Sequence, residues 1–166
     1  MDAVRLVKAG QHALTQSRSA LDIVAEAWQA QALAQAIGSH LAATGPPELR
    51  GEARGLSEAG SRGCAILAHP GMRIGGVRAT QLSEVSDPAG ALTALGGLLG
   101  DVAMALVSVA CATEEEGLYW QCMEAIDVAD ESSDRVRGML RRLTLREQER
   151  RQRPSDMVRD STAGPP

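Results

Sequence analysis

Apolar residues recur along most of the chain at alternating intervals of three and four, the spacing of one face of an α-helix. The pattern predicts helices over about residues 2–16, 20–43, 47–69, 88–112 and 113–151. Short turns separate most of them, which favours antiparallel neighbours. We therefore expect an all-α fold, an antiparallel helical bundle of four long helices plus a shorter N-terminal one, occupying residues 1–152.

Two segments fall outside this pattern. Residues 70–86 are less regular, and we expect a loop with one or two helical turns after residue 79. Residues 153–166 contain three prolines and few large apolar residues, so we expect a disordered C-terminal tail.

The ends of the helices carry recognisable signals. Gly45-Pro46-Pro47 is expected to stop the second helix and start the third. Ser86-Asp87-Pro88 is expected to open the fourth, and Thr113 with Glu116 fits a capping box for the fifth. Four glycines lie within the third helix, each costing about 1 kcal/mol relative to alanine, so tertiary packing must offset that cost.

Two stripes indicate how the helices pack. The second helix carries small residues that would let a neighbour approach closely: Ala20, Ile23, Ala27, Ala30, Ala34, Ile37 and Leu41. On the fifth helix we expect the buried stripe to be Tyr119, Cys122, Ile126, Ala129, Ser133, Val136, Leu140 and Leu143.

Composition narrows the class of protein. There are 27 Ala and 18 Leu, no Phe, and three aromatic residues, so a β-sandwich or barrel is excluded. The three cysteines cannot build a disulfide scaffold, and we expect them to be small core residues. With no secretory signal at the N-terminus, we expect a cytoplasmic protein.

Residues 90–112 carry a single charge, Asp101, and are long enough to span a bilayer. The central position of Asp101 and the lack of a flanking Lys/Arg cluster disfavour that reading. We expect the central helix of a soluble bundle, with Asp101 on its polar side or bonded to a neighbour.

The fifth helix has a steep charge gradient. Residues 114–134 hold eight acids and no base, whereas residues 135–153 hold eight arginines and two glutamates. The simplest interpretation is a solvated face ordered along the helix dipole. The functional alternative is that its basic end binds an acidic partner, through Arg141, Arg142, Arg146, Arg150 and Arg151. The acidic half argues against nucleic acid as that partner.

Candidate chemistry is sparse. Glu124 and Asp127 match the E-x-x-D half of the Mg²⁺ site of all-α nucleoside triphosphate pyrophosphohydrolases, but the preceding helix offers only Asp101 for the other half. The three histidines lack metal-ligand spacing. We therefore predict no catalytic residue, no metal site and no cofactor.

The aromatic residues, Trp28, Tyr119 and Trp120, are the remaining concentration of chemistry. They either fill space in an alanine-rich bundle or flank a ligand pocket or partner interface. In the second case the candidate binding residues are these three together with Glu124 and Asp127.

Two stretches carry a resemblance: residues 25–56, with Trp28 and the Gly45-Pro46-Pro47 turn, and residues 117–127, with Tyr119-Trp120. They resemble an uncharacterised family of small helical proteins, a domain of unknown function, from high-GC actinobacteria. The resemblance spans residues 1–150. It implies a bacterial cytoplasmic protein and transfers no catalytic residue.

The sequence therefore favours a non-enzymatic protein-interaction or regulatory module that forms a homo-oligomer or binds another protein. The alternative is a bundle that binds a small molecule or nucleotide, with Mg²⁺-dependent hydrolysis at Glu124 and Asp127 beside Trp120. Membrane association through residues 90–112 is a third and weaker reading.

Overall fold

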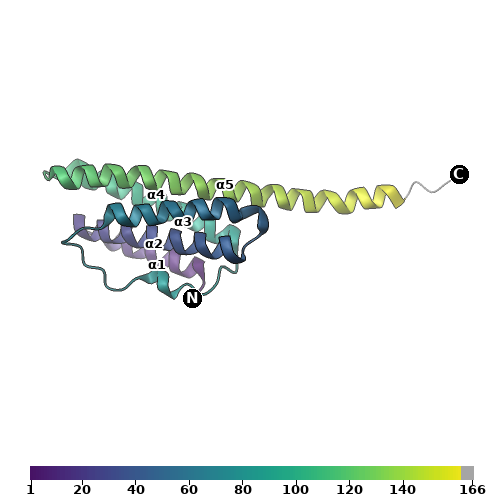
Figure 1. The fold of residues 1–166 in the computed structure, drawn as a ribbon, viewed down its shortest axis with the longest axis horizontal. Coiled ribbons are helices and arrows are strands. Elements are labelled where there is room, and N and C mark those ends of the chain that lie inside the picture. Colours follow the sequence, from purple (N-terminus) through teal and green to yellow (C-terminus); the bar gives the residue numbers. More distant parts are fainter. Residues whose placement is uncertain (162–166) are drawn as a thin grey trace.

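A computed structural model shows an all-α protein, as the spacing predicts (Figure 1). It describes the backbone of residues 1–161 and the side chains of residues 1–153. The α-helices are α1 (Ala3–Gln16), α2 (Ala20–Thr44), α3 (Arg50–Leu67), α4 (Pro88–Ala112) and α5 (Glu116–Ser161). Short 3₁₀ turns lie at Pro47–Leu49 and Arg78–Gln81, and an isolated parallel β-bridge joins Asp2 to Glu84.

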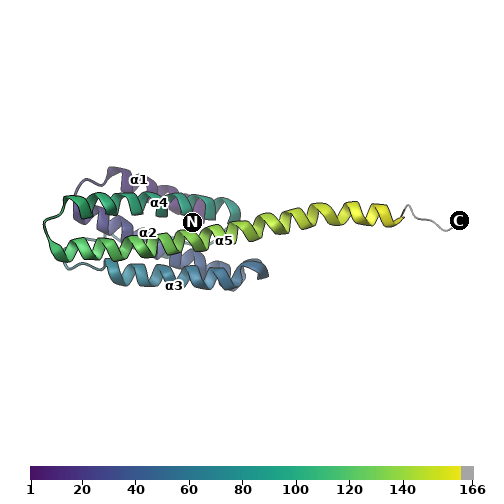
Figure 2. The ribbon, with the colours of Figure 1, turned by 90° about the horizontal axis from the view of Figure 1, so that it is seen from above.

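Four helices form a ring in the order α2, α3, α5, α4, and α1 lies in the groove between α2 and α4. Seen from above, α5 lies between α3 and α4 (Figure 2). The connection from α3 to α4 runs back along the bundle, so neighbours in the ring are antiparallel (Figure 1). The predicted antiparallel bundle of four long helices and one shorter helix is thus confirmed.

Most of the predicted stop and start signals act as expected. Asp87 caps α4 by accepting a hydrogen bond from the Gly90 N–H at 3.0 Å, and Pro88 is its first residue. The capping box at Thr113 is wrong. Thr113 ends α4, and its hydroxyl accepts from the Glu115 N–H at 3.1 Å, so α5 begins only at Glu116.

The core is built from leucine and alanine. The small-residue stripe of α2 is buried from Ala27 to Leu41, and α3 packs closely on it. On α5 the predicted stripe is displaced by one residue at alternate positions. The side chains that reach the core at 3,4 spacing are Leu118, Cys122, Ala125, Ala129, Ser132, Val136 and Met139.

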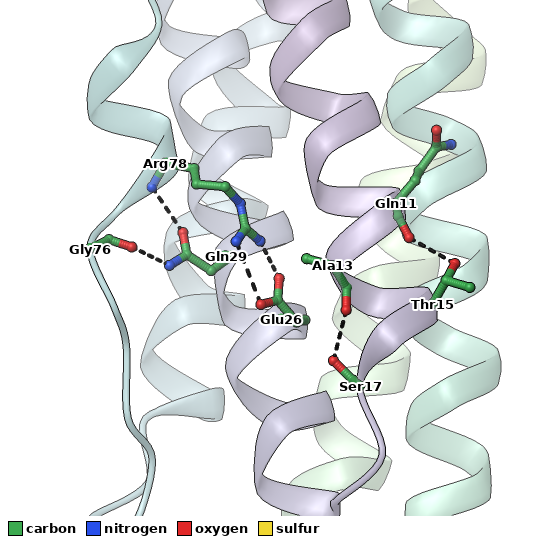
Figure 3. Close-up of polar contacts among 8 residues, drawn as sticks. All are labelled: Gln11, Ala13, Thr15, Ser17, Glu26, Gln29, Gly76 and Arg78. Atoms are coloured by element: carbon green, nitrogen blue, oxygen red, sulfur yellow. Dashed lines mark hydrogen bonds and ion pairs between the residues drawn. The ribbon is translucent and has the colours of Figure 1, made fainter.

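The crossover from α3 to α4 is fastened to α2 by side chains (Figure 3). The Gln29 amide donates to the Gly76 carbonyl at 2.5 Å and accepts from the Arg78 N–H at 3.0 Å. The Arg78 guanidinium also forms an ion pair with Glu26. Gly76 has a φ of 111°, a conformation that glycine adopts without strain. The expected loop with a short helical turn is therefore held against α2 by these contacts, and we call this connection, residues 68–87, the strap.

Helix α4 is long and apolar enough to cross a membrane by length and composition. Its apolar residues at spacings of three and four, from Leu92 to Val109, are buried in the bundle. The opposite side faces outward and includes Asp101 as well as Met104, whose exposed fraction is 72%. The interpretation as a bundle helix with Asp101 on its polar side is consistent with this packing.

Helix α5 is longer than its neighbours and extends past the bundle at its C-terminal end (Figures 1 and 2). Its side chains from Glu147 to Arg153 are all exposed. The helical backbone continues to Ser161, beyond the predicted domain boundary at residue 152. The expected disordered tail therefore differs from the structure over residues 153–161, where the backbone is helical, and its last part, residues 162–166, lies outside the described residues.

Candidate functional site

The first turns of α5 carry two of the three aromatic side chains. Tyr119 and Trp120 pack edge to face, with ring centroids 5.1 Å apart and an interplanar angle of 82°. Trp120 is 56% exposed. Tyr119 is 37% exposed, so its predicted place on the buried stripe is wrong, and Leu118 enters the core instead. The pair is an exposed aromatic surface of the kind enriched in protein interfaces.

Trp28 lies elsewhere. It is half-buried on α2, and its backbone carbonyl accepts a hydrogen bond from the Cys64 thiol of α3 at 3.7 Å. Its ring lines a shallow groove of about 340 Å³ between α2, α3 and the strap, together with Cys64, Val77 and Thr80. This volume is at the lower end for small-molecule sites. The three aromatic residues therefore do not form one site.

Glu124 and Asp127 are both exposed on α5. They belong to a row of acids that continues with Glu131, which pairs with Arg62 of α3 at 2.6 Å, and Asp134, which pairs with Arg137 at 3.1 Å. In the part of the chain with described side chains, no three Asp, Glu, His or Cys residues converge on a potential metal position. The structure therefore brings no further acid to Glu124 and Asp127.

The basic end of α5 is partly engaged within the chain. The Arg142 guanidinium lies 4.0 Å from Glu52 at the start of α3, and that of Arg146 lies 3.7 Å from Glu48 in the 3₁₀ turn before α3. Arg141, Arg150 and Arg151 form no ion pair with the described side chains. The predicted basic end thus divides into two arginines that lie near glutamates at or just before the start of α3 and three with no ion pair among the described side chains.

Sequence reasoning missed three further exposed apolar side chains on α4 and α5. Met104 and Val107 near the end of α4, and Met123 on α5, are exposed by 72%, 43% and 38%. Together with Tyr119 and Trp120 they account for five of the seven large hydrophobic side chains that are exposed among those described. The 3,4 spacing did not reveal Met104 and Val107 because apolar residues occur around most of α4 and not only on its buried stripe.

The cysteines differ in exposure. Cys122 is buried and Cys64 half-buried, but Cys111 is exposed, so the prediction of three core cysteines is wrong for Cys111. Burial raises the pKa of the Cys64 thiol to about 11 and raises the pKa of Cys122 as well. Both are therefore protonated thiols at neutral pH, which are poor nucleophiles.

Comparison with known proteins places the chain in a family without assigning an activity. No curated protein and no solved structure matches it. A family model described as "Family of unknown function (DUF6099)" matches residues 1–142, the part of the chain that forms the bundle. The chain therefore belongs to the DUF6099 family of unknown function.

Proposed function

We propose that the protein is a non-enzymatic, cytoplasmic protein-interaction module in which α5 is the recognition helix. The observation that carries the proposal is that α5 continues past the bundle as an exposed, arginine-rich helix (Figure 1). A helix without a core to cover gains little stability from tertiary packing, so its length serves the bundle only up to its last buried turns.

The chemistry of the exposed helix indicates an acidic partner surface. Arg141, Arg150 and Arg151 lack an intramolecular counterion among the described side chains. Guanidinium groups bind carboxylates through paired hydrogen bonds and are common at protein interfaces. Glu147 and Glu149, together with the acidic first half of α5, would repel the phosphates of a nucleic acid.

The test compares the full chain with a chain truncated after Leu143, and a control chain truncated after Arg153 keeps the described arginines. Each serves as bait for capture from cell extract, with light scattering to measure oligomeric state. We expect the full chain and the control to bind the same protein partner, and the shorter truncation to lose it. An unchanged set of captured proteins, together with a monomer in every form, would contradict the proposal.

The alternative, a bundle that binds a small molecule or nucleotide, is measured in the same preparation. Nucleoside triphosphates with Mg²⁺ are added while thermal unfolding is monitored. A ligand that binds only the folded state raises the apparent stability by about 2.7 kcal/mol at one hundred times its dissociation constant. We expect no shift. A shift that is lost in Glu124→Gln would replace our proposal with the nucleotide-binding one.

A further inference from the structure

One face of α5 carries an uninterrupted row of exposed side chains on the side away from the core. We call it the outer stripe, and its members at spacings of three and four are Trp120, Met123, Asp127, Asp130, Asp134, Arg137, Arg141, Leu145 and Gln148. All nine are exposed. Residues at this spacing lie on one face of a helix, so the stripe is a continuous strip of surface that no part of the described chain covers.

The order of residues along the outer stripe is self-complementary. From its N-terminal end it reads aromatic and apolar, then acidic, then basic, then apolar and polar. When two identical strips are laid antiparallel about Asp134, Asp127 of each copy faces Arg141 of the other, and Met123 faces Leu145. Asp130 lies beside Arg137 of the second copy. A parallel arrangement would instead place acid against acid and arginine against arginine, which is repulsive.

The negative charges at the centre of this arrangement are balanced by arginines. The two Asp134 carboxylates meet there, and each is already paired with Arg137 of its own chain at 3.1 Å. Such a contact uses the same patch on both molecules, as a two-fold symmetric dimer requires. Because the Arg-rich end of α5 extends past the bundle, it is free to lie along α5 of a second molecule (Figure 1).

We propose that the outer stripe of α5 pairs antiparallel with the outer stripe of a second copy of this chain. The inference rests on the proposed function and names the partner of the same helix. From Trp120 to Gln148 the strip is about 42 Å long at 1.5 Å per residue. A strip one helix wide falls at the small end of specific interfaces, below about 1,200 Å². The dimer is therefore reversible, and ionic strength weakens it because its charges stay near solvent.

Charge reversal tests the pairing directly. In the full chain, Arg137→Glu with Arg141→Glu makes every charged residue of the stripe acidic, and Asp127→Arg with Asp130→Arg makes every charged residue basic except the central Asp134. Sedimentation over a range of concentrations should show each variant dimerising at least about tenfold more weakly than wild type. A mixture of the two should form a heterodimer, because every reversed pair is again opposite in charge. The control for the acidic variant is Arg50→Glu with Arg54→Glu on α3, which changes net charge by the same amount and sign but lies off the stripe.

The register is tested by disulfide formation in a Cys111→Ser background, which removes the exposed native thiol. Asp134→Cys alone should cross-link two copies, because residue 134 meets its own counterpart. Asp127→Cys and Arg141→Cys should each fail alone and cross-link when mixed. A monomer at every concentration and at low salt, or a dimer that both charge reversals leave intact, would overturn this inference. In the first case a captured partner that depends on residues 144–153 would still support the proposed function.

Discussion

Two glycines set the distance between α2 and α3. A Cβ atom built on Gly38 of α2 would lie 2.7 Å from the Ala53 carbonyl oxygen and 2.7 Å from the Ser57 nitrogen of α3. A Cβ on Gly60 of α3 would meet the backbone of α2 at Gln31 and Gln35 at the same 2.7 Å. The two helices therefore touch backbone to backbone at both positions, and a methyl group has no room.

We predict that Gly38→Ala and Gly60→Ala destabilise the protein although alanine favours the helix. The propensity gain is about 1 kcal/mol in a helix interior. Against it stands overpacking, which costs about 1–3 kcal/mol and reaches the upper end here because the obstacle is backbone and cannot change rotamer. The net loss is about 1–2 kcal/mol for each substitution. At about 2–4 °C per kcal/mol for a chain of this size, each lowers Tm by about 2–8 °C.

Gly51→Ala is the matched control. It is on the same helix as Gly60, but a Cβ there would find no atom within 4 Å. We expect it to stabilise the protein by about 0.5–1 kcal/mol, because alanine lowers the conformational entropy of the unfolded chain and favours the helix more than glycine does. Urea unfolding followed by circular dichroism gives all three free energies, provided that the m-values agree. If Gly38→Ala and Gly60→Ala stabilised the protein as Gly51→Ala does, the close approach of α2 and α3 would be refuted.

Three further predictions concern the core, the strap and the thiols. Ser132→Ala removes the 3.3 Å hydrogen bond to the side-chain oxygen of Gln31, a buried residue whose amide nitrogen already has no partner. Urea unfolding should therefore show a free energy of unfolding lower by about 1–3 kcal/mol. Arg78→Ala removes the guanidinium contact of the strap with α2 but keeps the backbone N–H of that residue, so global stability should change little while amide exchange over residues 76–82 becomes faster. Cys111 should react first with a thiol reagent at neutral pH because it is exposed. Cys64 should react about a hundredfold more slowly than a thiol of reference pKa 9.0, because its pKa of about 11 leaves that much less thiolate. Equal rates for Cys64 and Cys111 would show that the groove beside α2 opens.

Helix type and position were predictable because the signals are local. The 3,4 spacing, the proline at residue 88 and the glycine-proline turn at residues 45–47 act within a few residues of where they stand. The predicted need for tight packing around the glycines of α3 also holds at Gly60, where α2 touches the backbone. It does not hold at Gly51, which is open to solvent, because spacing gives no information on which turn of a helix meets a neighbour.

The face of α5 that enters the core was harder to predict. The first turns offer Leu118 and Tyr119 at adjacent positions, and either continues a 3,4 row through Cys122. Which one is buried depends on where α3 and α4 lie on the two sides of α5, a property of the tertiary arrangement. The displacement by one residue turned Tyr119 outward beside Trp120. An exposed aromatic surface was thus hidden in what the sequence presents as core.

The sequence places the candidate acids and arginines on α5, but it does not show which of them form ion pairs with other parts of the chain. Arg142 and Arg146 are paired with glutamates near the start of α3, ninety or more residues earlier in the chain, and only the fold brings these charges together. Of the arginines without an ion pair among the described side chains, only Arg141 lies on the outer stripe with Asp127. Any function based on the Arg-rich end therefore depends on fewer charges than composition indicates.

The buried stripe and the outer stripe of α5 end at different residues. The buried stripe ends at Met139, with Leu143 half-buried one turn later, close to residue 142 where the family match also ends. The outer stripe continues to Leu145 and Gln148, past the last side chain that the bundle buries. Because the first half of α5 is held by the bundle, the extension does not need its own helix nucleus. Packing explains the first stripe, whereas the second has no role in the bundle and is the surface that the proposed second copy would cover.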